Sequence, residues 1–149
     1  MEMNIEDNFV LLFDKNNNIA YNALEELQKE SEKTDRVYPY LDRLNDMLDS
    51  DNSYIRTRGL TLIAYNAKWD KNNKIDEIID EYLKHIEDVK PITARQCIKL
   101  LPMIAKNKPE LKCDIVFALQ KADISIYADS MQPLVYKDIQ NSLAEIEKL

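Results

Sequence analysis

Few side chains in this sequence have the types and spacing that chemistry requires, and the first pair is a carboxylate and an imidazole. Glu81 and His85 are four residues apart, so a helix would place them one turn apart on the same side. Zinc and di-iron sites need further ligands at other spacings, and His85 is the only histidine of the chain. We therefore interpret His85 as a half-exposed helix residue paired with Glu81, and we expect neither a metal nor a cofactor.

A run of carboxylates lies just before this pair. Asp76, Glu77, Asp80 and Glu81 would stack on one side of a helix, where acidic groups can bind a divalent cation or exchange protons. Carboxylates four residues apart beside an apolar stripe are more typical of a solvated face, and Lys84 partly relieves their repulsion. Their place near a helix N-terminus also suits the helix dipole. We predict that they form an outer, solvent-facing surface.

The chain has two cysteines, Cys97 and Cys113. Cys97 falls on an apolar helix face, where cysteine behaves as a small buried hydrophobe. A nucleophilic cysteine would need a histidine as its base, and nothing in the sequence places one nearby. Two cysteines are also too few to staple a small secreted fold. We therefore predict no catalytic residue and a protein that is not an enzyme.

The elements that must position these residues are predicted to be helices. The 149 residues include one glycine and five prolines, whereas β-hairpins need glycine at their positive-φ turns. Apolar residues at helical spacing predict eight helices joined by short polar connections, which make sequence neighbours antiparallel in space. The helices are marked by Ile5–Phe13, Ala20–Leu27, Tyr38–Leu48, Ser53–Trp69, Ile75–Ile86, Ala94–Ala105, Leu111–Leu119 and Leu134–Ile146. We predict an all-α fold that forms a single domain over residues 1–149.

The charge of the chain narrows the class of partner. The formal net charge is −7, and a phosphate-binding surface needs clustered lysine and arginine, so nucleic acid is disfavoured as the default partner. No apolar run approaches the roughly 20 residues that cross a bilayer, so no membrane contact is expected. The N-terminal residues lack the basic start and apolar run of a secretory signal. We expect a cytoplasmic protein.

An internal repeat is the most informative feature of the sequence. Gly59–Lys68 and Cys97–Lys106 align at an offset of 38 with leucine, alanine and lysine identical at three positions, and such periods indicate stacked helical repeats. A shift of 36 the other way makes Ala23 equivalent to Gly59, so we predict small residues where neighbouring helices approach closely. Pro102 lies inside the sixth helix and is predicted to kink it near Ile98 while both ends stay helical.

Aspartates recur between the predicted helices, at Asp14, Asp49, Asp88 and Asp123. A carboxylate in such a turn can accept hydrogen bonds from the free N–H groups that open the next helix.

The segment Leu48–Arg56, followed by an apolar helix with a small residue, resembles the turn between the paired helices of a HEAT repeat. The resemblance implies a short right-handed α-solenoid of about four antiparallel helix pairs, of the HEAT or armadillo-like type. It also implies a ladder between repeats in which Asp49 or Asp51 pairs with Arg56. Asn52–Lys108 is similar to small bacterial HEAT-like proteins of unsettled role, some labelled with iron–sulfur assembly, although a cluster needs more thiolates than two cysteines supply.

The enzyme alternative depends on Tyr65, Trp69 and Asp70. The helical architecture resembles a HEAT-like class of DNA alkylation-repair glycosylases, whose groove contains aromatic residues, an aspartate and basic residues. Those enzymes are longer and their grooves are strongly basic, and a tryptophan at a helix end is more often a packing residue. The alternative function is therefore a nucleic-acid-acting relative of these glycosylases.

Superposing the repeats predicts a docking surface. The helix faces not used for the core would lie side by side on the inner, concave surface of a solenoid and carry only basic charge. They comprise Thr57, Thr61, Tyr65 and Lys68, then Arg95, Lys99, Met103 and Lys106, then Pro133, Lys137 and Asn141. Exposed helix faces also carry charge for solubility alone. We predict a non-enzymatic scaffold that binds another protein or an acidic peptide through Lys68, Arg95, Lys99 and Lys106, with Tyr65 and Trp69.

Overall fold

The computed structural model describes residues 4–149, and all regular structure in that range is helical. Eight α-helices follow one another, as the apolar spacing predicts. Their bounds are α1 Ile5–Leu11, α2 Asn17–Lys33, α3 Leu41–Met47, α4 Ser53–Tyr65, α5 Lys74–Leu83, α6 Pro91–Asn107, α7 Lys112–Lys121 and α8 Gln132–Glu147. Short 3₁₀ turns lie between them at η1 Tyr38–Tyr40, η2 Ala67–Trp69, η3 Lys84–Glu87, η4 Pro109–Leu111 and η5 Ile124–Ile126. Over residues 4–149, no helix is both long and apolar enough to span a bilayer.

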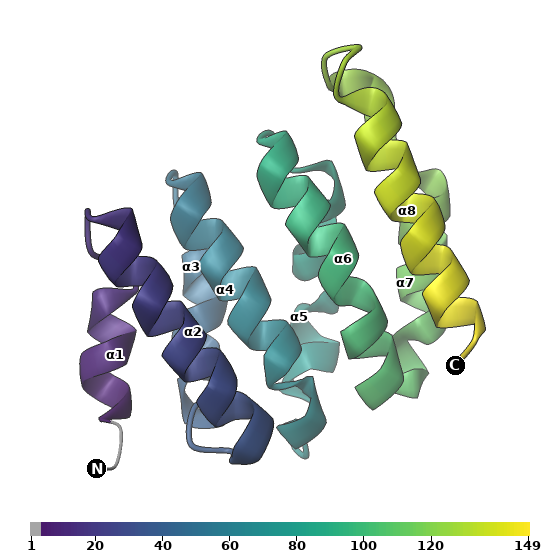
Figure 1. The fold of residues 1–149 in the computed structure, drawn as a ribbon. Helices are drawn as coiled ribbons and strands as arrows, with labels where there is room; N and C mark the ends of the chain where they lie inside the picture. Colours follow the sequence, from purple (N-terminus) through teal and green to yellow (C-terminus); the bar gives the residue numbers. More distant parts are fainter. Residues whose placement is uncertain (1–3) are drawn as a thin grey trace.

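The helices form two layers. Helices α2, α4, α6 and α8 lie side by side in one layer, with α1, α3, α5 and α7 behind them, and the two ends of the chain lie at opposite ends of the row (Figure 1). Within the front layer α2 contacts α4, α4 contacts α6, and α6 contacts α8. Each front helix can therefore bury apolar area against its neighbours in the row and against the layer behind it.

Polar side chains set where several helices begin. The amides of Asn4, Asn16 and Asn52 accept hydrogen bonds from backbone N–H groups that open α1, α2 and α4, which are otherwise without partners. The predicted aspartate turns form in three of four cases, at Asp14, Asp88 and Asp123, each accepting from the N–H two residues on. In the fourth turn the Ser50 hydroxyl accepts from the Asn52 N–H instead, so the prediction is wrong at Asp49.

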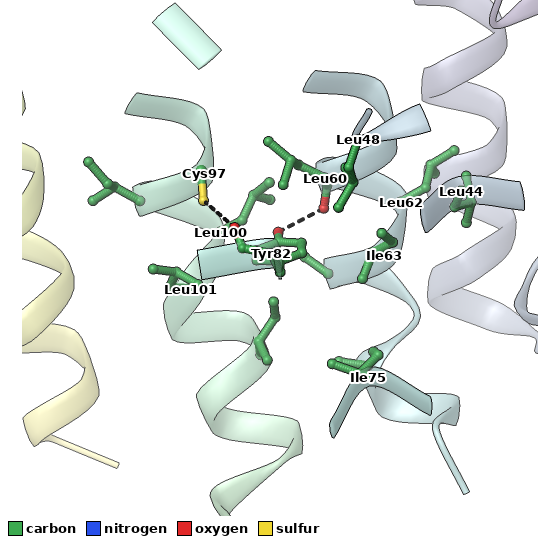
Figure 2. Close-up of a cluster of buried hydrophobic side chains, with 14 of the residues drawn as sticks. Leu44, Leu48, Leu60, Leu62, Ile63, Ile75, Tyr82, Cys97, Leu100 and Leu101 are labelled. Carbon is green, nitrogen blue, oxygen red and sulfur yellow. Dashed lines mark hydrogen bonds between the residues drawn. The ribbon is translucent and has the colours of Figure 1, made fainter. Parts of the chain in front are cut away.

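The small residues of the repeat lie in the core, as predicted. Ala23, Gly59 and Cys97 are all buried. A Cβ on Gly59 would lie 2.9 Å from the Leu44 carbonyl oxygen and 3.0 Å from the Met47 Cβ, so α3 crosses α4 at a distance that only glycine permits. Figure 2 shows the surrounding cluster, in which the Tyr82 hydroxyl reaches the buried Leu60 carbonyl oxygen at 2.8 Å.

Helix α6 continues through Pro102 and stays helical on both sides, as predicted. Proline has no N–H to donate to the Ile98 carbonyl, which would leave this buried oxygen without a partner. The Ser142 hydroxyl of α8 donates to that oxygen at 2.8 Å. The proline in one helix is therefore compensated by a hydroxyl from the next helix in the row.

Asp88 joins three successive helix pairs. Its carboxylate accepts hydrogen bonds from Arg56 Nε at 3.0 Å and Nη2 at 2.8 Å, and lies 2.7 Å from His85 Nδ1. Its carbonyl oxygen accepts from the Tyr127 hydroxyl at 2.6 Å. The acidic partner of Arg56 is thus Asp88 in the next inter-helix turn, which corrects the expectation that Asp49 or Asp51 would pair with it.

A second buried aspartate lies at the other end of α5. Asp70 accepts from the Tyr38 hydroxyl at 2.6 Å and from the backbone N–H groups of Lys74 and Ile75, both at 2.9 Å. The ammonium of Lys108, itself buried, lies 3.0 Å from the same carboxylate and also pairs with Asp76 at 2.8 Å. Asp70 therefore caps α5 and ties it to the segments on both sides.

The surroundings of the two aspartates favour their charged forms. Burial alone would raise the pKa of Asp88, but hydrogen bonds from His85 and Arg56 outweigh it and hold that pKa well below its usual range. Burial likewise opposes the charge of Asp70, and hydrogen bonds, the largest from Tyr38, lower its pKa. The same contact contributes, after burial, to raising the pKa of Tyr38 to about 12.

Gly59→Leu should overpack the crossing of α3 and α4, because the nearest obstacle is backbone that cannot move aside. We expect a loss of roughly 1–3 kcal/mol of unfolding free energy, measured as a lower urea midpoint. The control is Lys137→Leu at an exposed position of α8, which should leave the midpoint almost unchanged. Equal midpoints for Gly59→Leu and the wild type would contradict the close crossing.

Ser142→Ala should leave the Ile98 carbonyl oxygen buried without a donor and cost about 1–3 kcal/mol. In a Pro102→Ala background the new N–H at position 102 can donate to that oxygen, so the same change should cost less. A double-mutant cycle followed by urea unfolding measures this coupling. An identical cost of Ser142→Ala in both backgrounds would show that the hydroxyl does not compensate the proline.

Stability should fall in acid because of Asp88. A carboxyl whose folded pKa is depressed contributes stability above its unfolded pKa of about 3.9, and the contribution is lost as pH falls through the folded value. Asp88→Asn leaves Arg56 buried without a counter-charge, so we expect a loss of about 3–5 kcal/mol at pH 7 and a shallower decline below about pH 4. Urea unfolding across pH tests this, with the exposed Asp46→Asn as control. A variant with the wild-type slope in acid would disprove the role of Asp88.

Candidate docking surface

The predicted basic residues of α6 lie at different degrees of exposure. Lys99 and Lys106 are exposed, and among residues 4–149 neither side chain has a hydrogen-bond or ion-pair partner. Arg95 is partly buried and its Nε donates to the carboxylate of Asp138 in α8 at 2.6 Å. The charge of Arg95 is therefore balanced within the chain by Asp138, an acid that is not one of the predicted stripe residues.

Lys68 and Trp69 follow α4 and contact the end of α2. The Lys68 ammonium donates to the Glu32 carbonyl oxygen at 2.7 Å and lies 4.9 Å from the centroid of the Trp69 ring. The indole N–H of Trp69 donates to the Ser31 carbonyl oxygen at 2.7 Å. Tyr65 is half-buried against the core. Trp69 is thus a packing residue that joins α2 to the turn after α4, as its position at a helix end predicts.

The acidic run and the histidine lie on and after α5, in the layer behind α4 and α6 (Figure 1). Glu81 pairs with Lys84 at 3.0 Å, while His85 Nδ1 lies against Asp88. The predicted pair of Glu81 with His85 is therefore wrong, because the chain tightens into a 3₁₀ turn from Lys84 onward and brings His85 next to Asp88. Asp76 is partly buried by its contact with Lys108, whereas Glu77, Asp80 and Glu81 are exposed.

An open groove of about 880 Å³ crosses α2, α4 and the N-terminal part of α6. It contains part of the predicted surface, since Thr57 and Thr61 line it, and it extends beyond that surface toward the helix N-termini. The lining residues are Asn17, Asn18, Tyr21, Leu24, Gln28, Ser53, Tyr54, Thr57, Arg58, Thr61, Lys90, Pro91, Ile92, Thr93 and Gln96. We call this feature the α2–α4–α6 groove.

The charge of the α2–α4–α6 groove is one-signed. Within residues 4–149, its basic lining residues are Arg58 and Lys90 and none of the lining residues is acidic, although the chain has a net charge of −7. A second hollow, about 560 Å³, lies between α5, η3 and α7 and is lined by Asp80, Glu87 and Asp114 together with Lys84 and Lys121. The absence of carboxylates is therefore a property of the first groove and not of concave surface in general.

Large apolar side chains lie exposed in the same groove. Tyr21 is 56% exposed, Tyr54 58% and Ile92 65%. A single exposed apolar residue needs no explanation, but three that line one groove form a surface that a partner could cover. The arrangement can bind a segment that supplies apolar side chains and negative charge.

The charged and apolar residues of this groove, Tyr54, Arg58, Lys90 and Ile92, are not part of the surface that the sequence predicts. Tyr54 and Arg58 are one helical turn apart, and the Arg58 guanidinium carbon lies 5.8 Å from the Tyr54 ring centroid. The spacing of four residues between them is visible in the sequence and is the signal that could have identified this pair. Lys90 and Ile92 flank Pro91, which begins α6. Neither residue belongs to the apolar stripe by which the helix is identified in the sequence.

Comparison with protein families, with curated proteins and with solved structures gave no match for this chain.

Proposed function

We propose that this chain is a non-enzymatic scaffold that docks an acidic segment of another protein in the α2–α4–α6 groove. The observation that carries the proposal is the charge of the groove: in the described part of the chain its lining contains Arg58 and Lys90 and no carboxylate, although the chain has a net charge of −7. Complementary charge of this kind speeds encounter with an acidic partner and disfavours others. Lys99 and Lys106 extend the positive potential along the exposed face of α6.

We also propose that the architecture is a short right-handed solenoid of four HEAT- or armadillo-like helix pairs. Polar contacts that recur about one repeat apart support this. The hydroxyls of Thr57 and Thr93 are 2.9 Å apart across 36 residues, and Lys108 Nζ donates to the Asp70 carbonyl oxygen across 38 residues. Stacked repeats contact mainly their neighbours and present a continuous surface, which suits a binding scaffold.

The dimensions of the groove fit a short peptide segment. Neighbouring helices pack about 8–10 Å apart, so three helices of one layer span about 20 Å. An extended chain advances about 3.3 Å per residue, so about six residues would cross the groove. Partner side chains could then contact Tyr21, Tyr54 and Ile92 while acidic groups approach Arg58 and Lys90.

The test is a selection of displayed random peptides, about twelve residues long, on the purified chain. We expect enrichment of aspartate and glutamate on the wild type and its loss on Lys90→Glu/Lys99→Glu, because both lysines are exposed and their reversal repels acidic peptides. The matched control is Lys71→Glu/Lys148→Glu, which changes net charge equally at exposed sites outside the groove. Peptides without acidic enrichment, or a control that loses binding as fully, would overturn the proposal.

A duplex DNA titration separates the nucleic-acid alternative. Binding that weakens steeply between about 50 and 200 mM salt would indicate phosphate contacts and favour a nucleic-acid-acting protein. We expect no such binding at physiological ionic strength from a chain whose exposed cations are outnumbered by carboxylates.

A further inference from the structure

Buried charges in residues 4–149 are paired with one exception. Six charged residues are nearly fully buried, and five of them form ion pairs within the chain: Arg56 with Asp88, Lys108 with Asp70, and Asp138 with Arg95. The sixth is Arg58, which is 6% exposed. Its guanidinium donates to the Leu12 carbonyl oxygen at 2.8 Å and to Asn17 Oδ1 at 3.3 Å, both of them uncharged acceptors.

An unpaired buried cation is costly. Taking an ion out of water is repaid only by a counter-charge or by hydrogen bonds that satisfy it, and two neutral acceptors do so in part. Burial accordingly lowers the pKa of Arg58, in contrast to Arg56, whose pKa is raised by Asp88. A guanidinium has five N–H donors, and these two contacts use only some of them.

The fold does not require a cation at this position. A shift of 38 residues, the offset of the internal repeat, takes Arg58 to Gln96, and both residues line the α2–α4–α6 groove. The equivalent position one repeat later is thus occupied by a neutral amide in the same layer of helices. The positive charge of Arg58 is a feature of the groove and not of the repeat.

We propose that Arg58 is the anchor of this groove and receives an aspartate or glutamate carboxylate of the docked segment. The carboxylate would accept from the remaining N–H donors of the guanidinium and supply the counter-charge that residues 4–149 do not provide. Tyr54, whose ring lies beside Arg58, and Ile92 across the groove would contact an apolar side chain next to the acidic residue. This inference rests on the proposed function and adds the residue and the motif that would give it specificity.

The probes are individual peptides taken from the display selection, each synthesised with its acidic residue and with the matching amide. We expect exchange of glutamate for glutamine to weaken binding to the wild type about tenfold or more, as for loss of a charge-assisted hydrogen bond. On Arg58→Met the two peptides should bind equally weakly. Arg58→Lys, which keeps the charge without the planar fork, should recover only part of the preference.

A urea midpoint for each variant separates anchoring from structure. Arg58→Met removes the donor to the Leu12 carbonyl oxygen but also the unpaired charge, so its midpoint should fall far less than that of Arg56→Met, which leaves Asp88 uncompensated. Folded Arg58→Met that still prefers the acidic peptide would overturn the anchor and leave the scaffold proposal standing. Selected peptides with no acidic residue would instead overturn the scaffold proposal itself.

Discussion

A buried carboxylate must have a partner for each oxygen, and the arrangement of the helix pairs depends on how Asp70 and Asp88 meet that requirement. The carboxylate of Asp70 is contacted by Tyr38 and Lys108, and that of Asp88 by Arg56 and His85. The backbone carbonyl oxygen of Asp88 adds a link to the last pair by accepting from the Tyr127 hydroxyl. Asp70 lies before α5 and Asp88 lies after η3, which directly follows α5. The two aspartates therefore fix both ends of the segment that α5 and η3 form. Displacing one helix pair along its neighbour would leave a buried charge without its partner. That costs more free energy than the loss of apolar contact at one side chain.

The apolar core then sets how closely the pairs stack. Apolar burial is non-directional and would be compatible with several offsets between neighbouring helices. Close packing at Gly59 is compatible with one offset, because only there does the absence of a side chain leave room for the backbone of α3. Pro102 acts in the same way between α6 and α8, since its absent N–H leaves an oxygen that Ser142 must face. Register along the row is therefore specified by polar and steric features, while the stability comes from the core that they align.

Features that depend on local sequence could be predicted, and features that depend on the stagger of the pairs could not. The eight helices, the burial of Ala23, Gly59 and Cys97, and the continuity of α6 follow from helical periodicity and side-chain size within one repeat. The partner of Arg56 lies 32 residues away and that of Arg95 lies 43 residues away. Those separations differ by more than a helical turn, so a single repeat offset taken from the sequence cannot identify both partners.

A stripe of basic residues at helical spacing indicates a surface of largely exposed cations, whereas the cation at the centre of the groove is buried. Exposed charges interact weakly because water screens them. A cation that is largely buried interacts strongly with whatever reaches it, and Arg58 is the one that the chain itself leaves without a counter-charge among residues 4–149.

Arg95 and Arg58 lie on adjacent helices of one layer, and they differ in their counter-charge as well as in burial. Asp138 contacts the first, and among residues 4–149 no carboxylate contacts the second. The chain has 27 acidic residues against 20 basic ones, so a carboxylate near Arg58 would be easy to supply from within the chain. Among residues 4–149, no carboxylate lies in the lining of the groove, and the proposed docking of an acidic segment rests on that observation.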